Sequence, residues 1–239
     1  MRVTERESRP GLALGLTLGL LVGSNLVANL VVPSGWYVAW NLAVAAALVV
    51  IARGIGGVGL AGMGLGRSGI APGLRWGGAI GGVIAGVILI AAVLPGTRDL
   101  FADDIGEVSG GGLLLRVLVV IPLGTVVMEE IAFRGCLPAL LDMRPGSSPR
   151  RTMVISALLF GLWHIVPSLH LGERNATMGD VLGNPLGQWA PVAAAVVATS
   201  VAGAALLWVR RRADSVVAPM LVHYSLNAAA TTAAWIVAR

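Results

Sequence analysis

Hydrophobic residues gather in long stretches of this chain, and polar residues lie between them. Seven stretches cover about residues 11–32, 36–52, 74–94, 113–141, 151–166, 188–209 and 215–237. About 20 apolar residues in an α-helix cross the hydrocarbon core of a bilayer, and most of these stretches approach that length. The pattern therefore predicts an all-α fold, a polytopic transmembrane helical bundle of about seven spans.

The composition agrees with a membrane protein. Of 239 residues, 56% are hydrophobic and 12% are charged, which is too apolar for an ordinary soluble domain. All 17 basic residues are arginine, and Ala, Val and Gly dominate, which indicates a GC-rich bacterial genome. The net charge of +5 does not require nucleic acid as a partner, because the arginines fall at helix ends. The single cysteine, Cys136, excludes an internal disulfide and a cysteine-based zinc site.

The arginines between the stretches are divided unequally between the two sides of the predicted bundle. Twelve lie on one side, at positions 2, 6, 9, 53, 67, 75, 144, 150, 151, 210, 211 and 212, and three lie on the other, at 98, 174 and 239. Short loops rich in Lys and Arg stay in the cytoplasm. We therefore expect an integral protein of the bacterial cytoplasmic membrane with its N-terminus in the cytoplasm.

The position of the ionisable motifs divides the chain into two parts. Residues 1–112 hold three apolar stretches, a glycine-rich cytoplasmic linker and an outer acidic loop, and residues 113–239 hold the helical core with every motif below. The linker contains a formal Gly-x-Gly-x-x-Gly at 54–59, but no strand precedes it, so a membrane-surface linker is favoured over a dinucleotide site. Glycines at 11, 15, 19 and 23 and at 78, 82 and 86 match the spacing with which membrane helices pack closely.

Three ionisable residues interrupt the fourth apolar stretch: Glu129, Glu130 and Arg134. A charge near the bilayer centre costs at least about 2.5 kcal/mol, so other groups of the protein must offset the cost of burying these three charges. His164 and His223 lie in two later stretches. At 1.5 Å per residue, Glu129, His164 and His223 lie about 18, 20 and 14 Å from the cytoplasmic ends of their helices, which places them at one level.

Residues four positions apart share a helix face, and each motif contains such pairs. The pairs are Glu129 with Phe133, Glu130 with Arg134, Phe160 with His164, and His223 with Asn227. We interpret Glu130 and Arg134 as a buried ion pair that orients Glu129. A carboxylate in a low-dielectric cavity near two histidines suits a general base, and His164 would share or orient its water. His223 and Asn227 offer hydrogen-bond donors for an oxyanion.

Together the three motifs resemble those of the CPBP family, which contains the CAAX prenyl proteases and bacteriocin-processing enzymes and is also called the Abi family. They are Glu129-Glu130-x-x-x-Arg134, Phe160-x-x-x-His164 and His223-x-x-x-Asn227, in this order on successive apolar segments. The resemblance covers about half the chain, from residue 113 to the C-terminus. Because the best-described members have eight spans, eight is the alternative to seven.

The resemblance implies an intramembrane endopeptidase whose cavity opens to the cytoplasm and whose substrates are membrane-anchored peptides or proteins. By position, Glu129 with His164 would activate the water, and His223 with Asn227 would form the oxyanion site. Prenylated CAAX substrates are a eukaryotic feature, so a bacterial host requires a different substrate.

A catalytic metal is the alternative to a metal-free site. Glu129, His164 and His223 make a two-histidine, one-carboxylate set of the kind that binds zinc, and the family is often labelled metalloprotease. The chain has no His-Glu-x-x-His on one helix, and its resemblance to glutamate-dependent members favours catalysis without metal. We therefore expect no required cofactor.

Two other classes of function stay open. A proton-coupled transporter would also bury Glu, His and Arg, but it predicts paired inverted repeats, whereas the motifs here all lie in the C-terminal half. A non-catalytic membrane scaffold or bacteriocin-immunity factor would keep the fold to bind a partner, and the complete set of four polar residues argues against it. We interpret Cys136 and Trp163 as packing residues and His170 as a loop residue.

Overall fold

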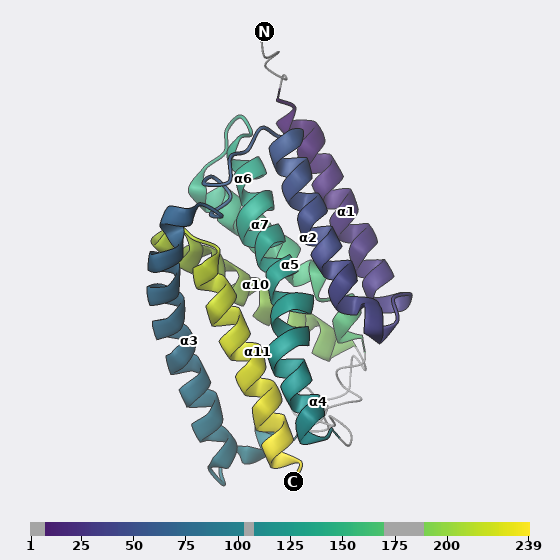
Figure 1. The fold of residues 1–239 in the computed structure, drawn as a ribbon, viewed down its shortest axis with the longest axis vertical. Helices are drawn as coiled ribbons and strands as arrows, with labels where there is room; N and C mark the ends of the chain where they lie inside the picture. The colour runs from purple at the N-terminus through teal and green to yellow at the C-terminus, as the bar shows by residue number, and fades with distance from the viewer. Residues whose placement is uncertain (1–7, 103–107, 170–188) are drawn as a thin grey trace.

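The computed structural model describes residues 8–102, 108–169 and 189–239 (Figure 1). Within these ranges the chain contains no strand, which confirms the predicted all-α class. The separate helices are α1 (Pro10–Leu30), α2 (Tyr37–Gly54), α3 (Ile70–Val93), α7 (Pro149–Trp163), α10 (Trp189–Ala213) and α11 (Val217–Val237). One longer helical segment runs from Gly110 to Asp142. Each begins and ends within a few residues of its predicted stretch, because the apolar runs determine the helix lengths.

Five helical segments of the described chain are long and apolar enough to cross a membrane. They are Pro10–Leu30, Ser34–Gly54, Arg67–Val93, Gly110–Asp142 and Trp189–Ala213. Helix α7 has only 15 residues, and α11 carries the polar residues His223 and Asn227. The chain is thus a polytopic helical membrane bundle, as predicted.

The Gly110–Asp142 segment is not a uniform α-helix. Its α-helical parts are α4 (Gly110–Leu115), α5 (Val127–Glu130) and α6 (Leu137–Asp142), and the stretches between them, Arg116–Val126 and Ile131–Cys136, are π-helical. Pro122 lies in the first π-helical stretch and lacks the N–H that an α-helical hydrogen bond requires. Such turns are frequent at functional sites, and here they flank the two glutamates.

This long segment lies at the centre of the bundle, in teal in Figure 1. Helices α1 and α2 pack against it on one side, and α11 packs against it on the other and is covered in turn by α3. Helix α7 contacts both α6 and α10. The part of the segment that carries the ionisable motif is therefore surrounded by protein rather than lipid.

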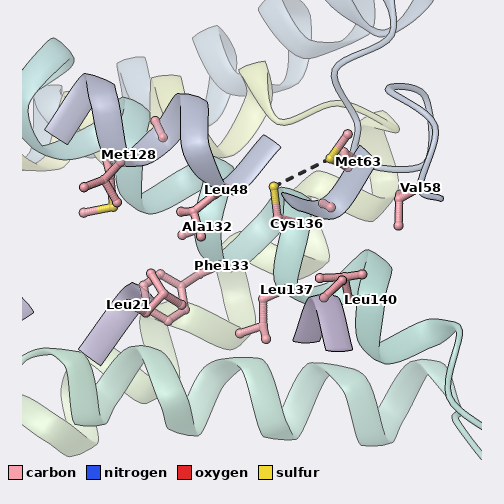
Figure 2. Packing of buried hydrophobic residues seen from close by; sticks show 14 of the residues in the cluster. Leu21, Leu48, Val58, Met63, Met128, Ala132, Phe133, Cys136, Leu137 and Leu140 are labelled. Carbon is pink, nitrogen blue, oxygen red and sulfur yellow. Dashed lines mark hydrogen bonds between the residues drawn. The ribbon is translucent and has the colours of Figure 1, made fainter. Parts of the chain in front are cut away.

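The main hydrophobic core packs around the same segment, as Figure 2 shows. Phe133 and Leu140 pack in one cluster with Leu48 of α2, and each is at most 2% exposed. The linker between α2 and α3 joins this core through Met63, which is fully buried, and the Cys136 thiol lies 3.6 Å from the Met63 sulfur. The central part of this linker therefore packs into the core at the end of the bundle where α2 ends and α3 begins.

Two glycines explain how the linker turns into the core. Gly57 and Gly64 both have φ of +74°, a left-handed conformation that glycine adopts without a steric penalty. The Gly64 carbonyl accepts a hydrogen bond from the Val216 N–H at 3.0 Å, which joins the linker to the start of α11. The glycine-rich pattern thus forms a folded turn that carries Met63 inward.

The glycine faces that bring helices together are not the predicted ones. No atom of the described chain lies within 4 Å of a Cβ built at residues 15, 19, 23, 78, 82 or 86. The contact between α3 and α11 instead uses Gly73, Gly77 and Gly81. A Cβ added at any of them would lie within 2.8 Å of an atom of α11 or of Ser215, which comes just before α11. Both faces of α3 repeat glycine every four residues, so spacing alone does not distinguish the packed face from the exposed one.

This difference predicts the effect of adding one methyl group to α3. A Cβ at Gly77 would lie 2.6 Å from the Ala218 carbonyl oxygen, whereas a Cβ at Gly78 would meet open space. Gly77→Ala should therefore lower the free energy of unfolding by about 1–3 kcal/mol relative to Gly78→Ala, since overpacking costs that much and both changes gain the same helix propensity. SDS titration in mixed micelles measures the difference, and equal midpoints would contradict the packing of α3 on α11.

Candidate active site

A buried ion pair lies next to the candidate base. Glu130 and Arg134 are fully buried, and Glu129 is 6% exposed. The Arg134 guanidinium lies 3.1 Å from Glu130 Oε1, and its central carbon lies 3.9 Å from the centre of the Phe160 ring. The pairing of Glu130 with Arg134 follows the interpretation of the sequence. One arginine faces two carboxylates here, so it can balance the charge of only one of them.

His223 of α11 contacts both glutamates. Its Nδ1 lies 2.8 Å from Glu130 Oε1, and its Nε2 lies 4.0 Å from Glu129 Oε2. An ionised carboxylate only accepts hydrogen bonds, so Nδ1 is the donor to Glu130. In the neutral form of the ring, Nε2 is unprotonated and lies toward Glu129 Oε2. The sequence analysis expected His223 near Glu129 but did not identify Glu130 as its hydrogen-bond partner.

Trp163 binds the candidate base directly. Its indole N–H donates to Glu129 Oε1 at 3.2 Å, and its backbone carbonyl accepts from the Asn25 side-chain amide of α1 at 3.0 Å. The interpretation of Trp163 as a packing residue alone is therefore incomplete. A polar Asn in the middle of an apolar helix is a signal for a buried partner, but the sequence does not show which partner it has.

An aromatic cluster supports these groups. The Phe160 ring lies 5.1 Å from the Phe133 ring, 4.6 Å from the His164 ring and 6.3 Å from the His223 ring, measured between centroids. The Phe133 ring also packs edge-on against Trp163. Phe133 and Phe160 thus pack beside the candidate site residues, with Phe160 in contact with both histidines.

His164 and Asn227 are placed differently from the other site residues. His164 follows the last residue of α7, and its Nδ1 lies 2.8 Å from the Phe160 carbonyl oxygen. Asn227 lies one turn after His223 on α11, and its half-buried side chain has no hydrogen bond within the described chain. His170 lies outside the described residues. The structure therefore brings together Glu129, Glu130, Arg134 and His223, whereas His164 bonds to a backbone carbonyl and Asn227 has no hydrogen bond within the described chain.

The geometry does not fit the alternative zinc set. Among the described residues, no three His, Cys, Asp or Glu side chains are grouped so that they could hold a metal ion. His164 bonds to a backbone carbonyl, and His223 turns Nδ1 to Glu130, which leaves Glu129 with one nearby imidazole nitrogen. Glu129, His164 and His223 do not converge as zinc ligands here.

The carboxylates retain free acceptor atoms. Glu129 Oε2 and Glu130 Oε2 are both buried and have no hydrogen-bond donor in the described chain. Burial of an unpaired carboxylate oxygen is costly, so such an arrangement is more typical of a site that binds another molecule than of a purely structural network. Glu129 Oε2, opposite His223 Nε2, is the carboxylate atom best placed to accept a hydrogen bond from such a molecule.

The comparisons with known proteins identify the family. Residues 111–229 match the family model described as type II CAAX prenyl endopeptidase Rce1-like. The chain belongs to this family. The match contains all three motifs, and it confirms the family expected from them. A search of curated proteins and a search of solved structures found no match to this chain. Helices α1 to α3 of this Rce1-like protein precede the matched residues, although Asn25 of α1 reaches the site through Trp163.

Proposed function

We propose that this Rce1-like protein is an intramembrane endopeptidase that hydrolyses peptide bonds of membrane-associated substrates with water activated by Glu129. The observation that carries the proposal is the buried approach of Glu129 Oε2 to His223 Nε2 at 4.0 Å, inside the family-matched residues. We also propose that it acts in a bacterial cytoplasmic membrane with its N-terminus in the cytoplasm, as the arginine distribution predicts.

The proposed water lies between Glu129 and His223. Two acceptor atoms 4.0 Å apart can each accept one hydrogen of a single bridging water, and both Glu129 Oε2 and neutral His223 Nε2 are acceptors. This geometry favours His223, rather than His164, as the histidine that orients the water. Glu129 takes a proton as the water oxygen attacks the peptide carbonyl carbon, and the carboxylic acid then protonates the leaving amine.

The oxygen of the attacked peptide carbonyl acquires negative charge during the attack, and hydrogen-bond donors must stabilise it. A neutral His223 cannot donate from Nε2 while Nδ1 donates to Glu130, so we assign the oxyanion to the amide of Asn227 on the same face of α11. His164 donates Nδ1 to the Phe160 carbonyl oxygen, so the Asn227 amide is the one oxyanion donor that we assign, and no step passes through a metal.

The experiment is proteolysis in reconstituted membranes with a panel of fluorogenic membrane-anchored peptides, with and without a strong chelator. We expect the wild type to cleave at least one peptide and to keep its rate in the chelator. Loss of cleavage in the chelator and its recovery with zinc would contradict the metal-free site. If the wild type cleaves none of the peptides, the result would contradict the proposed protease activity and favour a non-catalytic scaffold.

Trp163 provides a prediction for the same assay. Trp163→Phe keeps an aromatic ring against Phe133 but removes the donor to Glu129 Oε1, so the carboxylate loses its fixed orientation. We expect kcat to fall about 10-fold with little change in KM, because a hydrogen bond to a charged group is worth about 1.5–3 kcal/mol. Trp208→Phe is the matched control, since Trp208 is half-exposed and packs against Trp76 of α3. Equal kcat values for both variants would show that Trp163 does not position the base.

A further inference from the structure

A small pocket lies at the arginine-rich end of the bundle, and none of the residues that line it is a candidate active-site residue. It has a volume of about 140 Å³ and lies between α1, the end of α6 and the start of α7. Its polar lining comes from Arg144, Ser147, Arg151 and Thr152, and its apolar lining includes Leu14 and Ile155. Two guanidinium groups thus face one small cavity that is apolar on another side.

These two arginines lack acidic partners within the described chain. Arg144 has no ion pair or hydrogen bond there, and Arg151 reaches only the Gly146 carbonyl oxygen, at 3.4 Å. Asp142, the acidic residue of this turn, accepts from the Thr152 hydroxyl and lies 3.7 Å from Arg211 of α10. The positive charge that lines the pocket is therefore not neutralised by the described residues around it.

Two helix N-termini add to the positive potential. Helix α1 begins at Pro10 and α7 begins at Pro149, both at this end of the bundle. The Arg144 guanidinium lies against the first turn of α1, since a Cβ at Gly11 would come within 3.0 Å of its Nη1. The partial positive charge of helix N-termini favours a bound anion, and arginines bind phosphate oxygens through paired hydrogen bonds.

We propose that this pocket binds the phosphate group of an anionic membrane lipid. The arginine-crowded end is the one that the positive-inside rule places at the cytoplasmic headgroups, where anionic lipids supply the counter-charge. Leu14 and Ile155 provide an apolar wall along which the first part of an acyl chain lies. A lipid satisfies both linings of the pocket, whereas a free phosphate ion satisfies only the polar one.

The test measures binding of three probes to the full chain in detergent by native mass spectrometry. The probes are a short-chain phosphatidylglycerol, the matching phosphatidylcholine and inorganic phosphate. We expect phosphatidylglycerol to bind most tightly and Arg144→Gln/Arg151→Gln to weaken it about 30-fold, since each arginine near an anionic lipid contributes about one kcal/mol. Equal binding of the two lipids, or binding of inorganic phosphate alone, would overturn a site for an anionic lipid.

A matched variant separates this site from general charge attraction. Arg67→Gln/Arg150→Gln removes the same charge from exposed arginines at the same end that do not line the pocket. It should retain wild-type affinity for phosphatidylglycerol. Both double variants should show wild-type helicity and thermal midpoints without lipid, because none of the four arginines has a buried partner. Equal weakening of both would overturn the pocket and leave only unspecific attraction.

Discussion

Replacing Glu129 with Gln should lower the rate of peptide cleavage by about 10²–10⁴-fold, the usual contribution of a general base. Gln keeps the shape of the side chain and can still accept from the Trp163 indole through its carbonyl oxygen, so the site should stay assembled. It cannot take a proton from water. The single-turnover rate with an excess of enzyme over a cleaved peptide measures the chemical step.

The matched control for this change is Asp214→Asn. Asp214 is an exposed carboxylate with φ of 46°, a left-handed conformation that Asn tolerates well. The control should cleave at the wild-type rate. A Glu129→Gln variant that cleaves as fast as the control would remove Glu129 from the mechanism. If Glu129→Gln loses helicity, the cleavage rates of the two variants are compared per folded molecule.

The sequence predicts the helices well because one physical quantity determines them. A bilayer demands about 20 apolar residues in a helix, so the runs in this chain already mark where α1, α2, α3 and α10 begin and end. The cost of buried charge likewise marks Glu129, Glu130 and Arg134 as a site, whatever their neighbours are. Matching depth then points to His223, which the structure places beside both glutamates.

The rest depends on how the helices are rotated about their axes. Lipid and protein are equally apolar, so no hydrophobic face tells which side of a membrane helix points inward. The glycines of α3 show this, since Gly77 packs against α11 while Gly78 faces open space. Small rotations also decide that His223 bonds to Glu130 and that Trp163, rather than His164, reaches Glu129. The end of α7 at Trp163, before His164, is a further local detail that hydropathy does not encode.

Removing the charge of Arg134 should have the largest effect on stability. Its guanidinium lies 3.1 Å from Glu130 Oε1, which is within the range of an ion pair. None of its nitrogen atoms has a hydrogen-bond partner within the described chain. Arg134→Met would leave Glu130 buried without its cation and would remove the contact with the Phe160 ring. Breaking one partner of a buried pair costs about 3–5 kcal/mol, so SDS titration in mixed micelles should show a loss of that size.

A second variant distinguishes the ion pair from the packing of the long side chain. Glu130→Gln/Arg134→Met removes both charges of the pair, and it should recover most of the stability lost in Arg134→Met because residue 130 is then no longer a carboxylate buried without its cation. Arg116→Met is the control: Arg116 is exposed in the same helical segment, and its replacement should change the free energy of unfolding by less than about 0.5 kcal/mol. If the double variant is no more stable than Arg134→Met, the loss comes from the contact with Phe160. The ion pair would then contribute mainly by keeping Glu130 ionised for His223, an effect on cleavage rather than on folding.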